Sequence, residues 1–197
     1  MNPLTALPRP DAATLDRLHA RLVDAAADDD TLDVAYRTVD TPLGSLLLAA
    51  TPAGLVRVAY ESEGHDAVLS TLATKVSPRV LRAPSRLDAT AREIDDYFAG
   101  RRHVFDLPLD LQLAHGFRRE VLTHLRDIAY GSTASYSAVA AAAGRPTAVR
   151  AAASACAVNP LPIVIPCHRV IRSDGSLGGY LGGVAAKQSL LALESAA

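Results

Sequence analysis

The spacing of apolar residues divides the chain into stretches with different expected structures. Leu15, Leu18 and Leu22 recur at helical spacing in an alanine-rich, charged segment, which predicts one helix inside residues 1–30. From Val34 onward apolar and polar residues alternate, and short runs rich in threonine, proline and glycine separate the next apolar stretches. Such alternation is typical of a half-buried strand. The predicted strands of a three-stranded antiparallel sheet are 34–38, 45–50 and 55–60.

Two predicted helices follow the sheet and complete a small α+β domain. One spans 66–76 and the other spans 88–98, where Tyr97 falls on a stripe that we expect to be buried. The next segment, 101–115, contains a proline, basic residues and no helical period, so we place a domain boundary near residue 105. The predicted parts are an N-terminal helical extension at 1–31, an α+β domain at 32–104 and a mainly helical domain at 105–197.

The C-terminal part contains two short alanine-rich helices in succession. After an amphipathic helix at 117–128, Ser135 can cap a helix that ends at Gly144, and Pro146 suits the first turn of another helix. Two such helices with a turn of about three residues between them are typical of helix-turn-helix DNA-binding units. An ordinary helical hairpin has the same pattern, and the pattern alone favours neither.

Composition restricts the class of protein. A chain of 197 residues with 49% hydrophobic content can bury one large core or two small ones. No segment approaches the roughly 18 apolar residues of a membrane helix, and the N-terminus does not resemble a signal peptide, so we expect a soluble, cytoplasmic protein. Two cysteines and scattered histidines argue against a disulfide framework or a zinc site. We therefore expect no metal and no cofactor.

The two halves of the chain differ in charge. Residues 1–100 hold 10 Lys/Arg and 15 Asp/Glu, a net charge of −5, whereas residues 101–197 hold 10 and 6, a net charge of +4. A polyanion such as nucleic acid would therefore meet the C-terminal half. The excess is small, and a soluble domain with no such partner explains it equally well.

The stretch NPLPIVIPCHRV at 159–170 holds the residues with the clearest chemistry. A cysteine is nucleophilic as the thiolate, which a neighbouring imidazole or cation favours by lowering the thiol pKa. Cys167 has such a setting, because His168 follows it. Neighbouring side chains of a strand point in opposite directions, so His168 can assist Cys167 only through a water molecule or if the backbone leaves the strand after Pro166. The alternative is a buried cysteine beside an incidental histidine.

The segment Pro166-Cys167-His168-Arg169-Val170 resembles the active-site signature of the O6-alkylguanine-DNA alkyltransferase family. The likeness continues in order and spacing through the approach at 159–162, Tyr136, Arg150, the glycine-rich loop at 178–183 and the terminal helix at 187–194. It is strong over 85–197, rests on the pattern of strands and turns over 32–84, and does not extend to 1–30.

The resemblance implies a catalytic group of four residues. Cys167 would accept the alkyl group, and His168 would take the thiol proton through a bound water molecule. Glu194 would orient the imidazole, which is the logic of a Cys-His-acid triad with water inserted. Asn159 would hold the turn that places the loop of Cys167.

The resemblance also implies how DNA is bound. A base stacked in a duplex is out of reach of a buried thiol, so the nucleotide must rotate out of the stack. Arg150 would fill the gap from the minor groove, and Tyr136 would crowd the 3′ phosphate. The further residues that the resemblance places at the DNA or the base are Tyr180, Pro162, Gly178, Leu181, Val170 and Ser135. Leu181 stands where the family often has a small polar residue, but the expected contact uses its backbone N–H.

The sequence thus predicts an α+β protein that repairs double-stranded DNA by direct reversal of damage. The alkyl group of O6-alkylguanine would pass irreversibly to Cys167, one group per molecule, and O4-alkylthymine is left open as a second substrate. We expect a monomer in solution. Two alternatives from other classes are a non-enzymatic sensor of alkylated bases, which Cys167 argues against, and a DNA-binding regulator. A Cys-His hydrolase is a third, but no oxyanion hole is evident.

Overall fold

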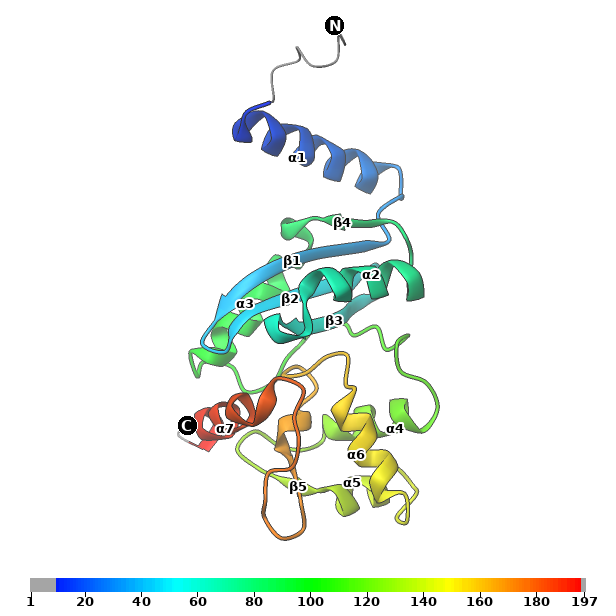
Figure 1. Ribbon diagram of the computed structural model, residues 1–197, viewed down its shortest axis with the longest axis vertical. Helices are drawn as coiled ribbons and strands as arrows, with labels where there is room; N and C mark the ends of the chain where they lie inside the picture. Colours follow the sequence, from blue (N-terminus) through cyan, green and yellow to red (C-terminus); the bar gives the residue numbers. More distant parts are fainter. Residues whose placement is uncertain (1–9, 196–197) are drawn as a thin grey trace, which may run out of the picture.

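The computed structural model describes residues 10–195, in which a sheet lies between an N-terminal helix and a mainly helical C-terminal part (Figure 1). The helices and strands are α1 (Ala12–Asp28), β1 (Val34–Thr41), β2 (Gly44–Thr51), β3 (Gly54–Tyr60), α2 (His65–Lys75), β4 (Val80–Arg82), α3 (Asp88–Phe98), α4 (Phe117–Leu125), β5 (Ala134–Ser135), α5 (Tyr136–Ala142), α6 (Val149–Ala157), β6 (Val170–Ile171) and α7 (Gly183–Ser195). The predicted α+β class is confirmed.

The N-terminal sheet has the strand order β3-β2-β1-β4. Strands β1, β2 and β3 form the predicted antiparallel meander, and β4 adds a short strand parallel to β1 that the sequence did not indicate, because three residues are too few to show alternation. The tight turn before β3 requires Gly54, since its φ is +139° and a Cβ atom there would lie 2.3 Å from the carbonyl oxygen of Pro108.

The two faces of the sheet are covered by different elements, as the alternation along the strands requires. Leu47 and Ala49 point to the face covered by α2, where they form a small apolar cluster with Val68 and Leu72. Residues on the other face, including Leu46 and Leu48, join a larger core that also contains residues of α3, α4, α6 and α7. One continuous core therefore links the sheet to the C-terminal part.

The outer edge of β3 is covered by the C-terminal part of the chain. Leu55 donates its N–H to the carbonyl of Pro108 (2.8 Å) and accepts from the N–H of Asp110 (2.9 Å). Val58 donates to the carbonyl of Pro160 (2.8 Å), just after Asn159. These bonds satisfy an otherwise open strand edge. They also fasten the segment that leads to Cys167 onto the sheet.

Helix α1 lies at one end of the molecule, beyond β4 (Figure 1). Its His19 side chain bonds the carbonyl of Arg82, and Val23 packs against the core. Leu15, Leu18 and Leu22 stay about half exposed. The predicted helix is present, and the part of residues 1–30 before residue 10 lies outside the described residues.

The helices of the C-terminal part follow the predicted order with two corrections. The hydroxyl of Ser135 accepts from the N–H of Ala138 (3.1 Å), as expected of a cap, and Gly144 has the left-handed φ of +73°. However, α4 ends at Leu125, and the second helix of the pair begins at Val149, not at Pro146. Pro146 lies in a turn closed by the bond from the Ala148 N–H to the Arg145 carbonyl, so the connection is longer than predicted.

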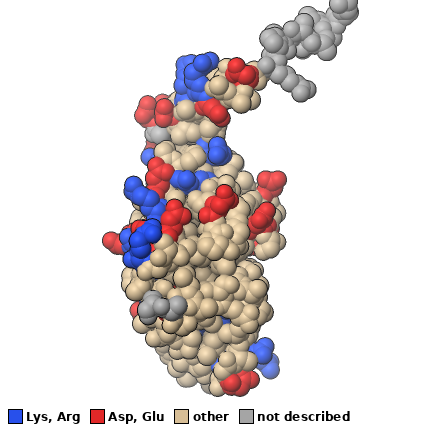
Figure 2. Space-filling view, turned by 90° about the vertical axis from the view of Figure 1, so that its left-hand side faces the viewer, with Lys and Arg blue, Asp and Glu red and all other residues tan. Residues whose placement is uncertain are grey.

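The charged residues are not evenly spread over the surface. On the face shown in Figure 2, Lys, Arg, Asp and Glu gather over the upper, N-terminal part, and the lower part is almost uncharged. Within residues 10–195 no helix is long and apolar enough to cross a membrane.

Candidate active site

The backbone around Cys167 is a buried loop rather than the strand that the sequence suggested. Ile163 has a φ of +73°, which is unfavourable for a β-branched residue and interrupts any extended run. Pro166, with φ −81° and ψ 60°, forms a tight turn in which Cys167 donates its N–H to the carbonyl of Ile165 (2.8 Å). A 3₁₀ turn then spans Cys167–Arg169. Cys167 and His168 thus lie in a turn and not in a strand, the condition under which His168 can serve Cys167.

The side chain of Asn159 holds this loop and contacts the thiol. Asn159 is fully buried, and its Oδ1 accepts from the N–H of Leu161 (3.0 Å). Its Nδ2 donates both to the carbonyl of Ile165 (2.9 Å) and to Sγ of Cys167 (3.1 Å). One amide therefore fixes both the shape of the loop and the position of the sulfur.

The thiol of Cys167 is 2% exposed, and this burial raises its pKa to about 11. The hydrogen bond from Asn159 and the positive charge of Lys187 lower the pKa but offset only part of the effect. The prediction that the setting of Cys167 lowers its thiol pKa is therefore wrong for the protein without DNA. At neutral pH the residue is a thiol, and a base must remove its proton during any reaction.

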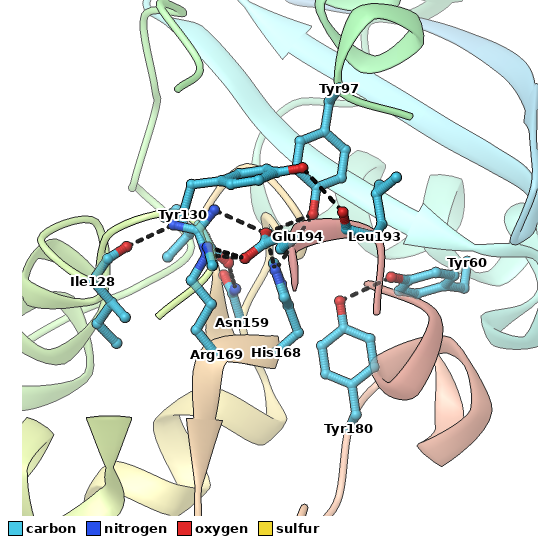
Figure 3. A network of polar contacts seen from close by, with 12 residues as sticks. Tyr60, Tyr97, Ile128, Tyr130, Asn159, His168, Arg169, Tyr180, Leu193 and Glu194 are labelled. Atoms are coloured by element: carbon cyan, nitrogen blue, oxygen red, sulfur yellow. Dashed lines mark hydrogen bonds and ion pairs between the residues drawn. The ribbon is translucent and has the colours of Figure 1, made fainter. Parts of the chain in front are cut away.

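His168, the residue after Cys167, forms a buried pair with Glu194 (Figure 3). Nε2 of His168 lies 2.8 Å from Oε1 of Glu194, and burial lowers the pKa of His168 even though Glu194 opposes the shift. Burial would raise the pKa of Glu194, but hydrogen bonds from His168 and Arg169 outweigh it and hold that pKa at about 2. A neutral imidazole that donates from Nε2 to an ionised carboxylate keeps Nδ1 as an acceptor. Nδ1 is buried and has no hydrogen-bond partner among the described residues.

Three residues that the sequence did not assign to the site act on this group, two by hydrogen bonds and Lys187 through its charge. Arg169 donates from Nε and Nη2 to the two oxygens of Glu194 (2.8 and 2.9 Å), and the hydroxyl of Tyr97 donates to Oε1 (2.7 Å). Nζ of Lys187, whose side chain is fully buried, donates to the carbonyls of Val170 and Leu177. Arg169 belongs to the signature segment, and a buried tyrosine on a helix stripe signals that its hydroxyl needs a partner.

A cleft of about 670 Å³ lies beside α6 and the glycine-rich loop. It brings together five of the predicted DNA and base contacts: Tyr136, Arg150, Gly178, Tyr180 and Leu181. Cys167, Pro162 and Val170 are buried and do not line it, and the hydroxyl of Ser135 is occupied in capping α5. The cleft is therefore a surface approach, and the buried thiol does not line it.

The N-terminal sheet supports one wall of this cleft. The hydroxyl of Tyr60, the last residue of β3, lies 2.9 Å from the hydroxyl of Tyr180, and the rings meet edge to face. Gly182 permits this contact, because a Cβ atom there would lie 2.6 Å from the Tyr60 ring. On the opposite side a Cβ atom on Gly178 would lie 3.0 Å from the hydroxyl of Tyr136. Both glycines thus sit in close contact with an aromatic residue.

The described residues contain no group of three or more His, Cys, Asp or Glu side chains arranged to hold a metal ion. The site offers instead a thiol, a neutral imidazole and a carboxylate, the groups of nucleophilic and general-base chemistry.

Comparison with known proteins identifies the family of this chain. Residues 34–111 match the family described as the ribonuclease-like domain of 6-O-methylguanine DNA methyltransferase, and residues 116–196 match the DNA binding domain. The methylated-DNA-protein-cysteine methyltransferase of Mycolicibacterium paratuberculosis is 39% identical over 161 residues, 82% of this chain and 92% of the relative. The crystal structure of Mycobacterium tuberculosis OGT in complex with DNA is similar with a TM-score of 0.72 and 35% identity, over 82% of this chain and 93% of that one.

This chain belongs to the 6-O-methylguanine DNA methyltransferase family. The bifunctional transcriptional activator/DNA repair enzyme Ada of Escherichia coli is also 39% identical, over 168 residues. That match covers 84% of this chain but only 47% of Ada, so the chain spans about half the length of that relative.

Proposed function

We propose that this protein repairs DNA by moving the alkyl group of O6-alkylguanine onto Sγ of Cys167. A bond forms between sulfur and the alkyl carbon while the bond from that carbon to guanine O6 breaks. Guanine leaves with the electron pair and takes up one proton, which balances the proton that the thiol gives up. The thioether product is stable and no group in the site could hydrolyse it, so each molecule acts once. The observation that carries the proposal is the buried Cys167 followed directly by a buried His168 that Glu194 orients.

The proton of the thiol leaves through His168. Because the pKa of Cys167 is about 11, the thiolate must form at the time of transfer. We propose that a water molecule between Sγ and Nδ1 of His168 passes the proton to the imidazole, and that Glu194 stabilises the resulting charge. Asn159 supports the thiolate, since its Nδ2 already donates to Sγ.

Double-stranded DNA would be bound by a monomer through its minor groove, with the damaged nucleotide rotated out of the stack. Arg150 is exposed on α6 beside the cleft, which suits a side chain that fills the gap in the duplex. Tyr136 would crowd the phosphate on the 3′ side. Tyr180 and Pro162 would flank the alkyl group, and the backbone N–H of Leu181 would contact guanine O6.

The remaining assigned residues support this pocket. Gly178 would leave space beside Tyr136, Val170 would position the chain behind Cys167, and Ser135 would hold the start of the first helix through its cap. O4-alkylthymine stays open as a second substrate.

The test is mass spectrometry of the protein after incubation with a duplex that carries one O6-methylguanine. We expect one methyl group on Cys167, full loss of transfer in Cys167→Ser and retained transfer in Cys156→Ser, a matched control for a buried thiol whose pKa burial raises to about 12. Binding of the damaged duplex without any adduct would favour the sensor alternative instead. An adduct on Cys156 would refute the assignment of the acceptor.

A further inference from the structure

The hydroxyl of Tyr97 reaches the catalytic carboxylate from the N-terminal part of the chain. Tyr97 lies in the last turn of α3, is fully buried, and donates to Oε1 of Glu194 at 2.7 Å. The same oxygen accepts from Nε2 of His168 at 2.8 Å. Figure 3 shows the phenol and the imidazole meeting at this carboxylate. Two parts of the chain that are far apart in sequence therefore share one acceptor atom.

The ring of Tyr97 is held by aromatic neighbours that do not depend on its hydroxyl. Phe98, Phe105 and Tyr130 lie with ring centroids at 5.4, 5.3 and 6.1 Å from it. A phenylalanine at this position would keep these contacts. The hydroxyl itself has the carboxylate of Glu194 as its nearest partner, with Nε2 of His168 at 3.5 Å.

We propose that Tyr97 is a positioning residue for alkyl transfer, whose hydroxyl holds Glu194 and limits the basicity of His168. The proposal rests on the proposed function, in which neutral His168 takes the proton of Cys167.

The basicity of His168 depends on how many hydrogen-bond donors the carboxylate of Glu194 has. Each hydrogen bond to the ionised form stabilises negative charge on Glu194 and reduces its attraction for a proton on His168. Both groups are buried, so water cannot readily replace a donor that is removed. Without the Tyr97 hydroxyl, the less stabilised carboxylate would hold a protonated His168 more strongly. The pKa of His168 would rise, and less of the imidazole would be free to act as base in mildly acidic solution.

Other charged or titratable groups also face this pair, and their arrangement leaves Tyr97 as the group to test. Arg169 forms a fixed ion pair with Glu194, and replacing it would leave a buried charge unpaired. The remaining groups that surround the pair are Cys167 on the same turn, Lys187 on α7, Tyr180 from the glycine-rich loop and Tyr130 from the loop after α4. Removing the Tyr97 hydroxyl changes no formal charge.

The experiment measures single-turnover transfer from duplex DNA by the full chain, from about pH 5 to about pH 9, where a general base shows its titration. Tyr97→Phe is compared with the unmodified protein and with Tyr130→Phe. Tyr130 is a matched control, because its ring lies over the Arg169 guanidinium (5.7 Å) while its hydroxyl bonds the carbonyl of Leu193. The melting temperature of each variant verifies that it is folded.

For Tyr97→Phe we expect the acid limb of the pH–rate profile to move up by about one pH unit, so that transfer is about tenfold slower on that limb and equal on the plateau. Tyr130→Phe should keep the midpoint of the unmodified protein. A merely structural role of Tyr97 would lower the rate equally at every pH. The proposal would be overturned by that result, by an unchanged pH–rate profile or by a downward shift of the acid limb.

A second variant covers the case in which Tyr97→Phe fails to fold. A tyrosine analogue with fluorine beside the hydroxyl at position 97 is a stronger donor, so the midpoint should move down. An upward or absent shift would refute the positioning role. If the unmodified protein forms no adduct on Cys167, the proposed function fails. If it forms the adduct but the rate shows no acid limb, the proposed function stands and the Tyr97 assignment fails, because no base then titrates in this range.

Discussion

Asn159→Ala is the substitution that should separate the shape of the active-site loop from its chemistry. It removes the acceptor of the Leu161 N–H and the donor to the Ile165 carbonyl and to Sγ of Cys167. The loop is buried, so the Leu161 N–H is left without a partner, at a cost of about 1 to 3 kcal/mol. Ile165 still accepts from the N–H of Cys167, so the second lost bond adds only about 1 kcal/mol.

The expected loss in the free energy of unfolding is therefore about 2 to 4 kcal/mol, which a protein of typical stability survives. For a chain of this length the melting temperature should fall by about 5 to 15 °C. Urea unfolding of the variant and of Gln188→Ala, an exposed amide on α7, gives the comparison. The control should change stability by less than about 0.5 kcal/mol.

The same substitution should also slow alkyl transfer. The hydrogen bond from Asn159 is the largest factor that lowers the pKa of Cys167, so its loss should raise that pKa further above about 11. Transfer should then be slower even at temperatures where the variant is fully folded. The reasoning is refuted if the variant loses less than about 1 kcal/mol and transfers at the rate of the unmodified protein.

Three further outcomes are expected. Gly182→Ala should lower the free energy of unfolding by about 1 to 3 kcal/mol, because its Cβ atom meets the Tyr60 ring. Adding Tyr60→Leu in the same chain should recover part of the loss. Strictly additive losses in unfolding experiments would argue against the clash. Arg150→Ala should slow transfer from duplex DNA far more than from the free base O6-benzylguanine, and equal slowing in both kinetic assays would exclude a gap-filling role. The pKa of Glu194 is lowered to about 2, so this carboxylate should contribute stability that is present above its ordinary pKa of 4.5 and is lost as the pH falls through about 2. Glu194→Gln should therefore lose less stability than the unmodified protein over this pH range. Parallel curves of stability against pH would contradict the cause assigned to the pKa shift.

Periodicity predicts much of the fold because it reports directly on burial. The alternation after Val34 locates β1, β2 and β3, and the helix predicted at 88–98 is α3. The predicted start of α6 at Pro146 is wrong, because proline fits a tight turn as well as the first turn of a helix. Only packing decides between the two. The short β4 has too few residues to carry a pattern.

The site is predictable where its chemistry lies in adjacent residues, and not where it depends on distant contacts. Cys167 and His168 stand out in the sequence, and the resemblance adds Glu194. An apolar run such as 161–165 fits a strand as well as a buried loop, and the hydrogen bonds of Asn159 select the loop. The raised thiol pKa follows from burial, which no local pattern reports, and the contact of Tyr97 with Glu194 joins residues 97 positions apart.

The coverage of the β3 edge has a consequence for how the molecule unfolds. Separating the sheet from the helical part would strip the N–H of Val58 and the carbonyl of Pro160 of their mutual bond and split an apolar core to which both parts contribute. Although the sequence matches two family segments, heating should therefore produce one cooperative transition rather than two. In a calorimeter the measured enthalpy should equal the van't Hoff enthalpy, as for a single folding unit.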